Sequence, residues 1–204
     1  PEVVDQSPGA GARGVALDRA VVLRFNADVD PVAAKASIRW RATSGAAVAF
    51  EVLQPPPDNP SDPASVIESR RRLVLKPGVP LQKATEYTVD VTRDLRSTEG
   101  PKPPKGAWSN AFRTYEPLAV TEVRCAGWSP EGQPCPPLQG FRVAFNNALA
   151  AQKFSELVTL APVVEGLVVK HWGDTLVLEG EFLASTKYTL ELKPGLKDVF
   201  GQEL

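Results

Sequence analysis

The phrase ATEYTVDV at residues 84–91 returns near the end of the sequence as STKYTLEL at residues 185–192. Five positions in and after it keep one spacing of 101 residues, pairing Thr85, Tyr87, Thr88, Leu95 and Gly100 with Thr186, Tyr188, Thr189, Leu196 and Gly201. Identities held at a single spacing indicate an internal repeat. We therefore interpret the chain as two copies of one β-module.

An upstream segment repeats as well. VVLRFNADVD at 21–30 matches FRVAFNNALA at 141–150, and both copies end an apolar run with a Phe-Asn pair. The boundary between the copies falls near residue 116, within FRTYEPLAV. The predicted domains are therefore residues 1–116 and 117–204, each an immunoglobulin-like β-sandwich.

Short alternating apolar runs fill both modules and predict an all-β fold. Segments rich in Pro and Gly separate the runs, as expected for a sandwich of short strands. Helical turns are predicted at 30–37 and 149–158. The predicted strands are 21–25, 37–41, 48–53, 72–76, 87–93 and 111–115 in the first module and 118–123, 141–145, 157–160, 167–172, 175–180 and 188–192 in the second.

The repeated tyrosine has a structural interpretation. In such sandwiches a tyrosine near the start of a late strand turns its hydroxyl back to the preceding corner. Tyr87 and Tyr188 are the predicted tyrosine corners, and Val89 and Leu190, two residues on, are expected to point into the core. Alternation along the first copy then buries Tyr87, Val89 and Val91 and leaves the residues between them outside.

The two modules differ at two places. The first carries an extra Pro-rich loop at residues 53–70, and it continues past Gly100 into a last strand within WSNAFRTY at 108–115. The second stops at DVFGQEL, just past Gly201. We therefore expect the second module to lack its final strand, or that strand to lie in a longer parent protein. An unpaired strand edge is a liability in a whole protein, which favours a fragment.

The amino-acid composition limits the classes of partner that are expected. The 204 residues include 23 Lys and Arg and 24 Asp and Glu, so the net charge is −1. Charges this evenly balanced produce no long-range electrostatic field that would attract nucleic acid, and no basic face that would bind a membrane. Neither partner is therefore expected. No run approaches the ~18 apolar residues of a membrane span. The sequence has no methionine, not even at position 1, which also favours a fragment.

Cys125 and Cys135 are the only cysteines. Their spacing is not one that binds zinc, and a single histidine cannot complete such a site. Because Pro and Gly residues between them let the chain fold back, we predict a disulfide and an exported, periplasmic or extracellular protein. The alternative is a pair of partly buried thiols in a cytosolic protein.

No residue is predicted to be catalytic, to bind a cofactor or to ligate a metal. His171 is the only histidine, and without a G-x-S-x-G elbow we interpret it as a solvent-facing turn residue. Asp58, Asn59 and Asp62 lack the order of a calcium loop and predict a solvated turn. The basic run SRRR at 69–72 is expected to face solvent. The tryptophans expected to pack cores and module edges are Trp40, Trp108, Trp128 and Trp172.

The order of these signals resembles a known family. PEVVDQSPGAGARGVALDRAVVLRFNADVD at 1–30, ATEYTVDV at 84–91 and STEG at 97–100 are similar to bacterial immunoglobulin-like modules of the SbsA/Big_5 type. FRVAFN, STKYTLEL and DVFG supply the same pattern in the second module. The resemblance covers nearly the whole chain and implies tandem immunoglobulin-like sandwiches.

The pairing of modules resembles a more particular family. A first module ending AFRTYEPLAVTEVRC, followed by a cysteine-bearing second module, looks like the N-terminal region of bacterial alpha-2-macroglobulin-like proteins. This implies a scaffold segment of a periplasmic protease trap, with other domains of the parent chain as partners and proteases trapped by the whole protein. The family's thioester motif C-x-E-Q is absent, since Cys125 precedes AGW and Cys135 precedes PPL, so no reactive residue carries over.

Three hypotheses remain. The first is a non-catalytic segment of a macroglobulin-like protease inhibitor. The second is a pair of spacer modules from a bacterial surface protein, adhesin, S-layer protein or extracellular hydrolase. The third is an enzyme, whose hydrolytic activity would depend on His171. We expect no enzyme and no cofactor.

Overall fold

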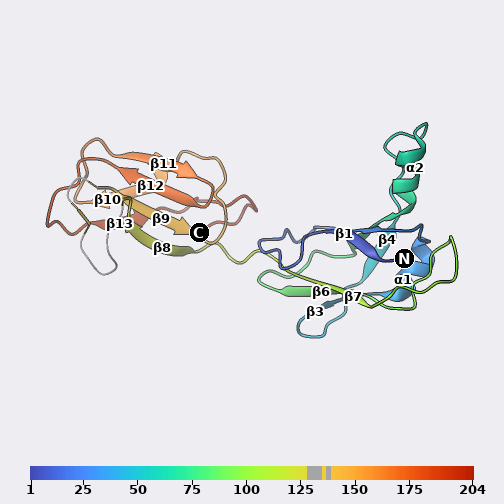
Figure 1. Cartoon of the computed structure of the whole chain (residues 1–204). Coiled ribbons are helices and arrows are strands. Elements are labelled where there is room, and N and C mark those ends of the chain that lie inside the picture. Colours follow the sequence, from blue (N-terminus) through green and yellow to red (C-terminus); the bar gives the residue numbers. More distant parts are fainter. Residues whose placement is uncertain (128–134, 137–138) are drawn as a thin grey trace. The chain divides into compact units, whose positions relative to one another are not determined.

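The computed structural model describes residues 1–127, 135–136 and 139–204 (Figure 1). The chain divides into two compact units, Pro1–Tyr115 and Glu116–Leu204, which we call the first and the second unit. Each is described by itself below. Trp128, which the sequence assigns to packing, lies outside the described residues.

Two antiparallel sheets form the first unit. One holds, in spatial order, β1 (Val3–Ser7), β2 (Val21–Phe25), β5 (Arg72–Pro77) and β4 (Phe50–Leu53). The other holds β3 (Ile38–Ala42), β6 (Glu86–Val91) and β7 (Trp108–Arg113). Lettered in chain order, these strands give sheets ABED and CFG, the arrangement of an immunoglobulin sandwich. The predicted all-β, immunoglobulin-like fold is confirmed.

The core of the first unit follows the predicted alternation. Tyr87, Val89 and Val91 of β6 are buried, and the residues between them are partly exposed. Leu23 and Leu75, from the other sheet, are fully buried in the same cluster. Burying one such side chain contributes roughly 1.5–3 kcal/mol, so this interleaving of the two sheets is a main source of the unit's stability.

Two helices lie in the connections of the first unit. α1 (Pro31–Ser37) confirms the helical turn predicted at 30–37, and Asp30 caps it by accepting a hydrogen bond from Ala33 N at 2.7 Å. α2 (Pro63–Arg70) corrects the loop predicted at 53–70. It begins with Asp-Pro, an N-cap followed by a proline whose missing N–H needs no partner. In Figure 1, α2 projects away from the sheets of this unit.

The second unit repeats this plan with fewer described strands. One sheet holds β11 (Val168–Trp172), β12 (Thr175–Glu179), β9 (Phe141–Phe145) and β8 (Val120–Cys125). The other holds only β10 (Val158–Ala161) and β13 (Thr189–Leu192). Helix α3 (Phe154–Leu157) precedes β10, inside the segment predicted to be helical. The strands correspond to ABED and CF, and no described residues form a strand in the place of G.

Each unit contains one tyrosine corner. The Tyr87 hydroxyl accepts a hydrogen bond from Gln82 N at 2.8 Å, and the Tyr188 hydroxyl accepts one from Leu183 N at 2.9 Å. The tyrosine of strand F thus holds the turn that leads into its own strand. The repeated phrase therefore encodes the same hydrogen bond in both units.

The turn itself has the same backbone conformation in both copies. Ala84 and Ser185 are the only described residues other than glycine with positive φ, at 52° and 53°. A side chain is disfavoured there, so each turn needs contacts that offset the strain. Thr85 and Thr186 supply one contact each, because their hydroxyls donate to Lys83 O and Ala184 O, two residues back.

Removing either tyrosine hydroxyl tests these corners. Tyr87→Phe is expected to destabilise the first unit by about 1–2 kcal/mol, because Gln82 N loses its partner beside a tyrosine that is only 3% exposed. Tyr188→Phe is expected to cost less than about 1 kcal/mol, since water can replace the hydroxyl at the exposed Leu183 N. Urea denaturation followed by residue-resolved NMR separates the units; equal losses for the two variants would contradict this account.

Candidate functional site

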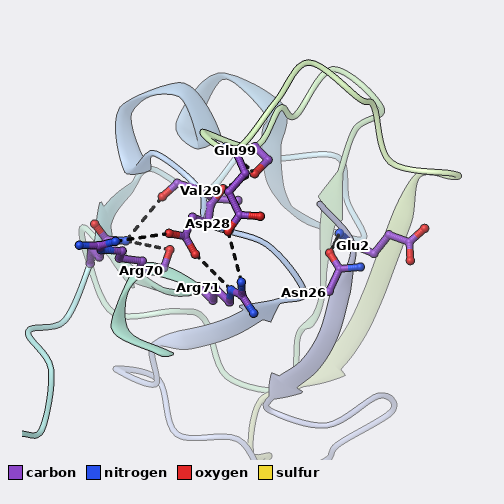
Figure 2. A network of polar contacts seen from close by, with 9 residues as sticks. Glu2, Asn26, Asp28, Val29, Arg70, Arg71 and Glu99 are labelled. Carbon is purple, nitrogen blue, oxygen red and sulfur yellow. Dashed lines mark hydrogen bonds and ion pairs between the residues drawn. The ribbon is translucent and has the colours of Figure 1, made fainter. Parts of the chain in front are cut away.

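The Phe-Asn pair that the repeat shares closes one end of each sandwich. In the first unit, Asn26 Oδ1 accepts a hydrogen bond from Glu2 N at 2.8 Å, and Asn26 N donates to Glu2 O at 3.0 Å. In the second unit, Asn146 makes the same two contacts with Ala119, at 2.9 and 3.1 Å. The asparagine thus fastens strand A to the end of strand B, and Figure 2 shows the Asn26 copy.

A charged network lies in the same region of the first unit (Figure 2). Asp28 Oδ1 accepts from Arg71 Nε at 3.1 Å, and Arg71 Nη2 lies 3.2 Å from Glu99 Oε1. Arg70 Nη1 lies 3.9 Å from the other oxygen of Asp28. The Asp28 side chain is only 16% exposed, so its charge is largely withdrawn from water and depends on these two arginines.

The same residues are joined through their backbones. Phe25 N donates to Arg71 O at 2.8 Å, and Val29 N donates to Arg70 O at 3.2 Å. Asp28 O accepts from Ser97 Oγ at 2.8 Å. The network therefore ties the segment after β2, the start of β5 and the turn before Gly100 into one cluster.

The electrostatics of this cluster favour a structural role. The hydrogen bond to Asp28, followed by that to Glu99, raises the pKa of Arg71, so its charge is retained. Both carboxylates are occupied by a guanidinium that cannot give up its proton in the working pH range. The arrangement offers no free base and no nucleophile. It corrects the prediction for residues 69–72, because Ser69 is buried and Arg71 is half-buried instead of facing solvent.

The second unit also has a buried carboxylate, but its partners are different residues. Asp198 is 1% exposed and lies in the turn before Gly201. Its oxygens accept hydrogen bonds from Phe200 N, from Gln202 N and Nε2, and from Asn147 Nδ2, at 2.7 to 3.0 Å. Four donors satisfy one buried carboxylate without a cation. The sequence analysis did not identify Asp198, although it lies in the DVFG phrase.

The two cysteines form a disulfide. Cys125 ends β8, and its sulfur is bonded to that of Cys135, with 5.5 Å between the Cα atoms. The bond closes a short loop of the second unit. Disulfides persist in oxidising compartments, so the bond points to a periplasmic or extracellular setting.

The remaining candidate residues occupy ordinary structural positions. His171 lies in β11, inside the strand predicted at 167–172, so its interpretation as a turn residue is wrong. Its ring packs 4.7 Å from that of Phe154, and Nε2 contacts Gly173 O. Asp62 caps α2, Asn59 accepts from Ser61 N, and exposed Asp58 lies 3.8 Å from Arg72. Trp40 is buried and Trp108 packs against the core, but Trp172 is 58% exposed, which corrects the prediction of packing for that residue.

Residues 1–127, 135–136 and 139–204 contain no group of three or more His, Cys, Asp or Glu side chains placed to hold a metal ion. Among the same residues, no helix is long and apolar enough to cross a membrane.

The charged network can be tested by mutating its two central members. We expect Asp28→Asn and Arg71→Met each to lower the melting temperature of the first unit. The double variant should lose no more than the worse single variant, because each change breaks the same pair. The loss should shrink in 1 M salt, which screens the pair. Arg93→Met, at an exposed position without a carboxylate partner in the described structure, is the matched control, and a comparable loss there would contradict the network's role.

Removing the disulfide by mutation tests its contribution to the stability of the second unit. The loop-closure relation gives about 3 kcal/mol for a loop whose cysteines are 10 positions apart. A Cys125→Ala, Cys135→Ala variant is therefore expected to be less stable by about 2–3 kcal/mol in the second unit and unchanged in the first. Denaturation followed residue by residue checks both halves of this statement. Stability equal to that of the oxidised protein would show that the bond does not restrict the unfolded chain as the loop-closure relation assumes.

Comparison with solved structures finds distant similarities, whereas comparison with curated proteins finds none. CopC from Methylosinus trichosporium OB3b matches 56% of this chain and 92% of its own, with 22% identity and a TM-score of 0.40. Two structures of the S-layer protein SbsC match 96% and 97% of this chain at 14% identity, each with a TM-score of 0.36. The chain spans about a third of the length of those S-layer structures.

One protein family matches a large part of the sequence. The bacterial Ig-like domain family, Big_5, matches residues 1–114, which is more than half of the 204 residues. The matched range ends one residue before the first unit does. Together with the ABED and CFG sheets of that unit, this match shows that the chain belongs to the bacterial Ig-like domain family.

Proposed function

We propose that this chain is a non-catalytic scaffold segment of an exported bacterial protein. The observation that supports the proposal is that the residues common to both units make structural contacts. Tyr87 and Tyr188 hold turns, Asn26 and Asn146 fasten strands, and the Asp28 carboxylate is paired within the fold. Side chains engaged in this way stiffen a module but perform no chemistry. The disulfide supports an exported setting.

The parent that we propose is an alpha-2-macroglobulin-like protease trap. The support is the resemblance in sequence, a first module that ends AFRTYEPLAVTEVRC followed by a cysteine-bearing second module. In such a parent, this segment would hold other domains at fixed positions. The chemistry of trapping would belong to residues elsewhere in the parent, and proteases would be partners of the whole protein.

A spacer in a bacterial surface protein is the second candidate. The family match favours it, because the bacterial Ig-like domain by itself implies no protease inhibition. Its partners would also be the neighbouring domains of the parent chain.

The gene on either side of this segment separates the two candidates. The protease-trap proposal expects a lipobox signal upstream, and a long run of β-modules with a C-x-E-Q motif downstream. Many further copies of the same module, or a catalytic or glycoside-binding domain, would instead assign the chain to the spacer class and overturn the macroglobulin proposal.

The scaffold proposal itself is tested on the purified chain. We expect it neither to hydrolyse peptide, ester and glycoside substrates nor to change the rate of added proteases. Activity lost in His171→Ala but kept in Trp172→Ala, its exposed neighbour in β11, would overturn the non-catalytic assignment.

A further inference from the structure

The outer face of the four-stranded sheet differs between the two units. In the first unit a row of charged residues crosses this face, because Asp5 lies opposite Arg24 and Arg24 lies opposite Arg72. Glu68 of α2 lies 3.7 Å from Arg24, and exposed Asp58 lies 3.8 Å from Arg72. The insertion that contains α2 thus pairs with the charges on this face.

In the second unit the corresponding row contains an aromatic side chain and small ones. Its members lie opposite one another in the order Trp172, Thr175, Ala144 and Glu122. We call them the Trp172 row. The repeat aligns Thr175 and Ala144 with Arg72 and Arg24 of the first unit. Residues 173 and 174 alone join β11 to β12, at the place where the first unit carries α2.

Trp172 is exposed at the edge of this face. Its exposed fraction is 58%, whereas Trp40 is 1% exposed and Trp108 packs against the core of the first unit. An exposed indole leaves a large apolar surface in water, and tryptophan is enriched among the residues that dominate binding energies. The short side chains of Thr175 and Ala144 leave room along the row for a ligand that contacts the ring.

The charges on the same face are paired except for one. Lys170 Nζ lies 2.5 Å from Glu179 Oε2, and Arg124 Nε lies 3.3 Å from Glu122 Oε2. Arg142 is exposed and forms no ion pair in the part of the chain that the structure describes. Its guanidinium presents N–H donors in a plane that matches the two oxygens of a carboxylate.

The separation of Trp172 and Arg142 suits a polymer of rings. Two strand spacings separate β11 from β9, and Arg142 lies two residues along β9 from Ala144 of the Trp172 row. The Cα atoms of Trp172 and Arg142 are therefore roughly 12 Å apart. A linear ligand that crosses the sheet contacts both side chains, whereas a single small ring contacts one of them.

A polysaccharide that contains uronic acids, the sugars with a carboxylate, has the chemistry that these features recognise. One face of a sugar ring consists of C–H groups, whose slight positive charge is attracted to the negative face of an indole. The carboxylate pairs with the free guanidinium of Arg142, and hydroxyl groups can bond Thr175. One free cation is too few to hold nucleic acid, which binds through many phosphate contacts.

We propose that the outer face of the β11–β12–β9–β8 sheet binds a polysaccharide that contains uronic acids. A sugar ring stacks on Trp172, and a carboxylate further along the polymer pairs with Arg142. The first unit does not bind it, because charged side chains occupy the corresponding row. This binding adds to the scaffold role and does not depend on which parent protein contains the segment.

Titration of the full chain with polygalacturonate tests the proposal. In NMR spectra we expect amide signals of β11, β12 and β9 to shift and those of the first unit to stay unchanged. Trp172→Ala should lower the affinity at least about tenfold, and Trp172→Phe, which keeps a ring, should lose less. Arg142→Gln should also lower it at least about tenfold. Both positions are exposed, so the variants are expected to fold.

Methyl-esterified polygalacturonate, which has the same sugar backbone without the charge, separates the two contacts. It should bind the original chain more weakly than polygalacturonate does, and Arg142→Gln should not weaken it further, whereas Trp172→Ala should. Equal affinity of the original chain for the two polymers would overturn the assignment of Arg142 to a carboxylate.

Lys193→Gln is the matched control for charge, since it removes an exposed cation beside β13, in the other sheet of the second unit. A loss as large as that of Arg142→Gln would show attraction by overall charge and overturn the proposal. Absence of shifts with polygalacturonate would overturn it as well. A dimer of the chain in sedimentation that Trp172→Ala abolishes would assign this face to a second copy instead.

Discussion

The turn before strand F, held by a hydrogen bond to the hydroxyl of that strand's tyrosine, is the constraint that the two sandwiches share. This hydrogen bond fixes a turn with an unfavourable backbone, at Ala84 in one unit and Ser185 in the other. That turn carries the chain from the ABED sheet into the second sheet. Once it is fixed, the alternation of β6 and β13 directs one face of each strand onto the core, and the remaining strands pair around it.

The two units share a backbone frame and differ in the side chains that close it. Val29 N donates to Arg70 O in the first unit, and Leu149 N donates to Gly173 O in the second. The first unit adds the Asp28–Arg71–Glu99 network at this end. The second surrounds Asp198 with neutral donors. The two units therefore share the backbone hydrogen bonds at this end. The charged side chains differ between the units because they add to a backbone arrangement that both units already have.

Sequence patterns revealed the features that repeat or alternate and missed those that depend on tertiary partners. The strands around Leu23, Val89 and Leu176 were predictable because alternation reports burial directly. β1 was missed, because this edge strand pairs with β2 alone and shows no clean alternation. α2 was hidden by the prolines around it, although Asp62 before Pro63 is a helix-start signal that could have revealed it. The Asp28–Arg71 pairing joins residues 43 positions apart, and no local pattern predicts such a contact.

The two units share some structural features and differ in others. The residues that define the repeat are used to build the fold, and the two units differ in other features. Among the described residues, only the first unit carries the projecting α2, and only the second carries a disulfide and a strand F (β13) with a single strand partner.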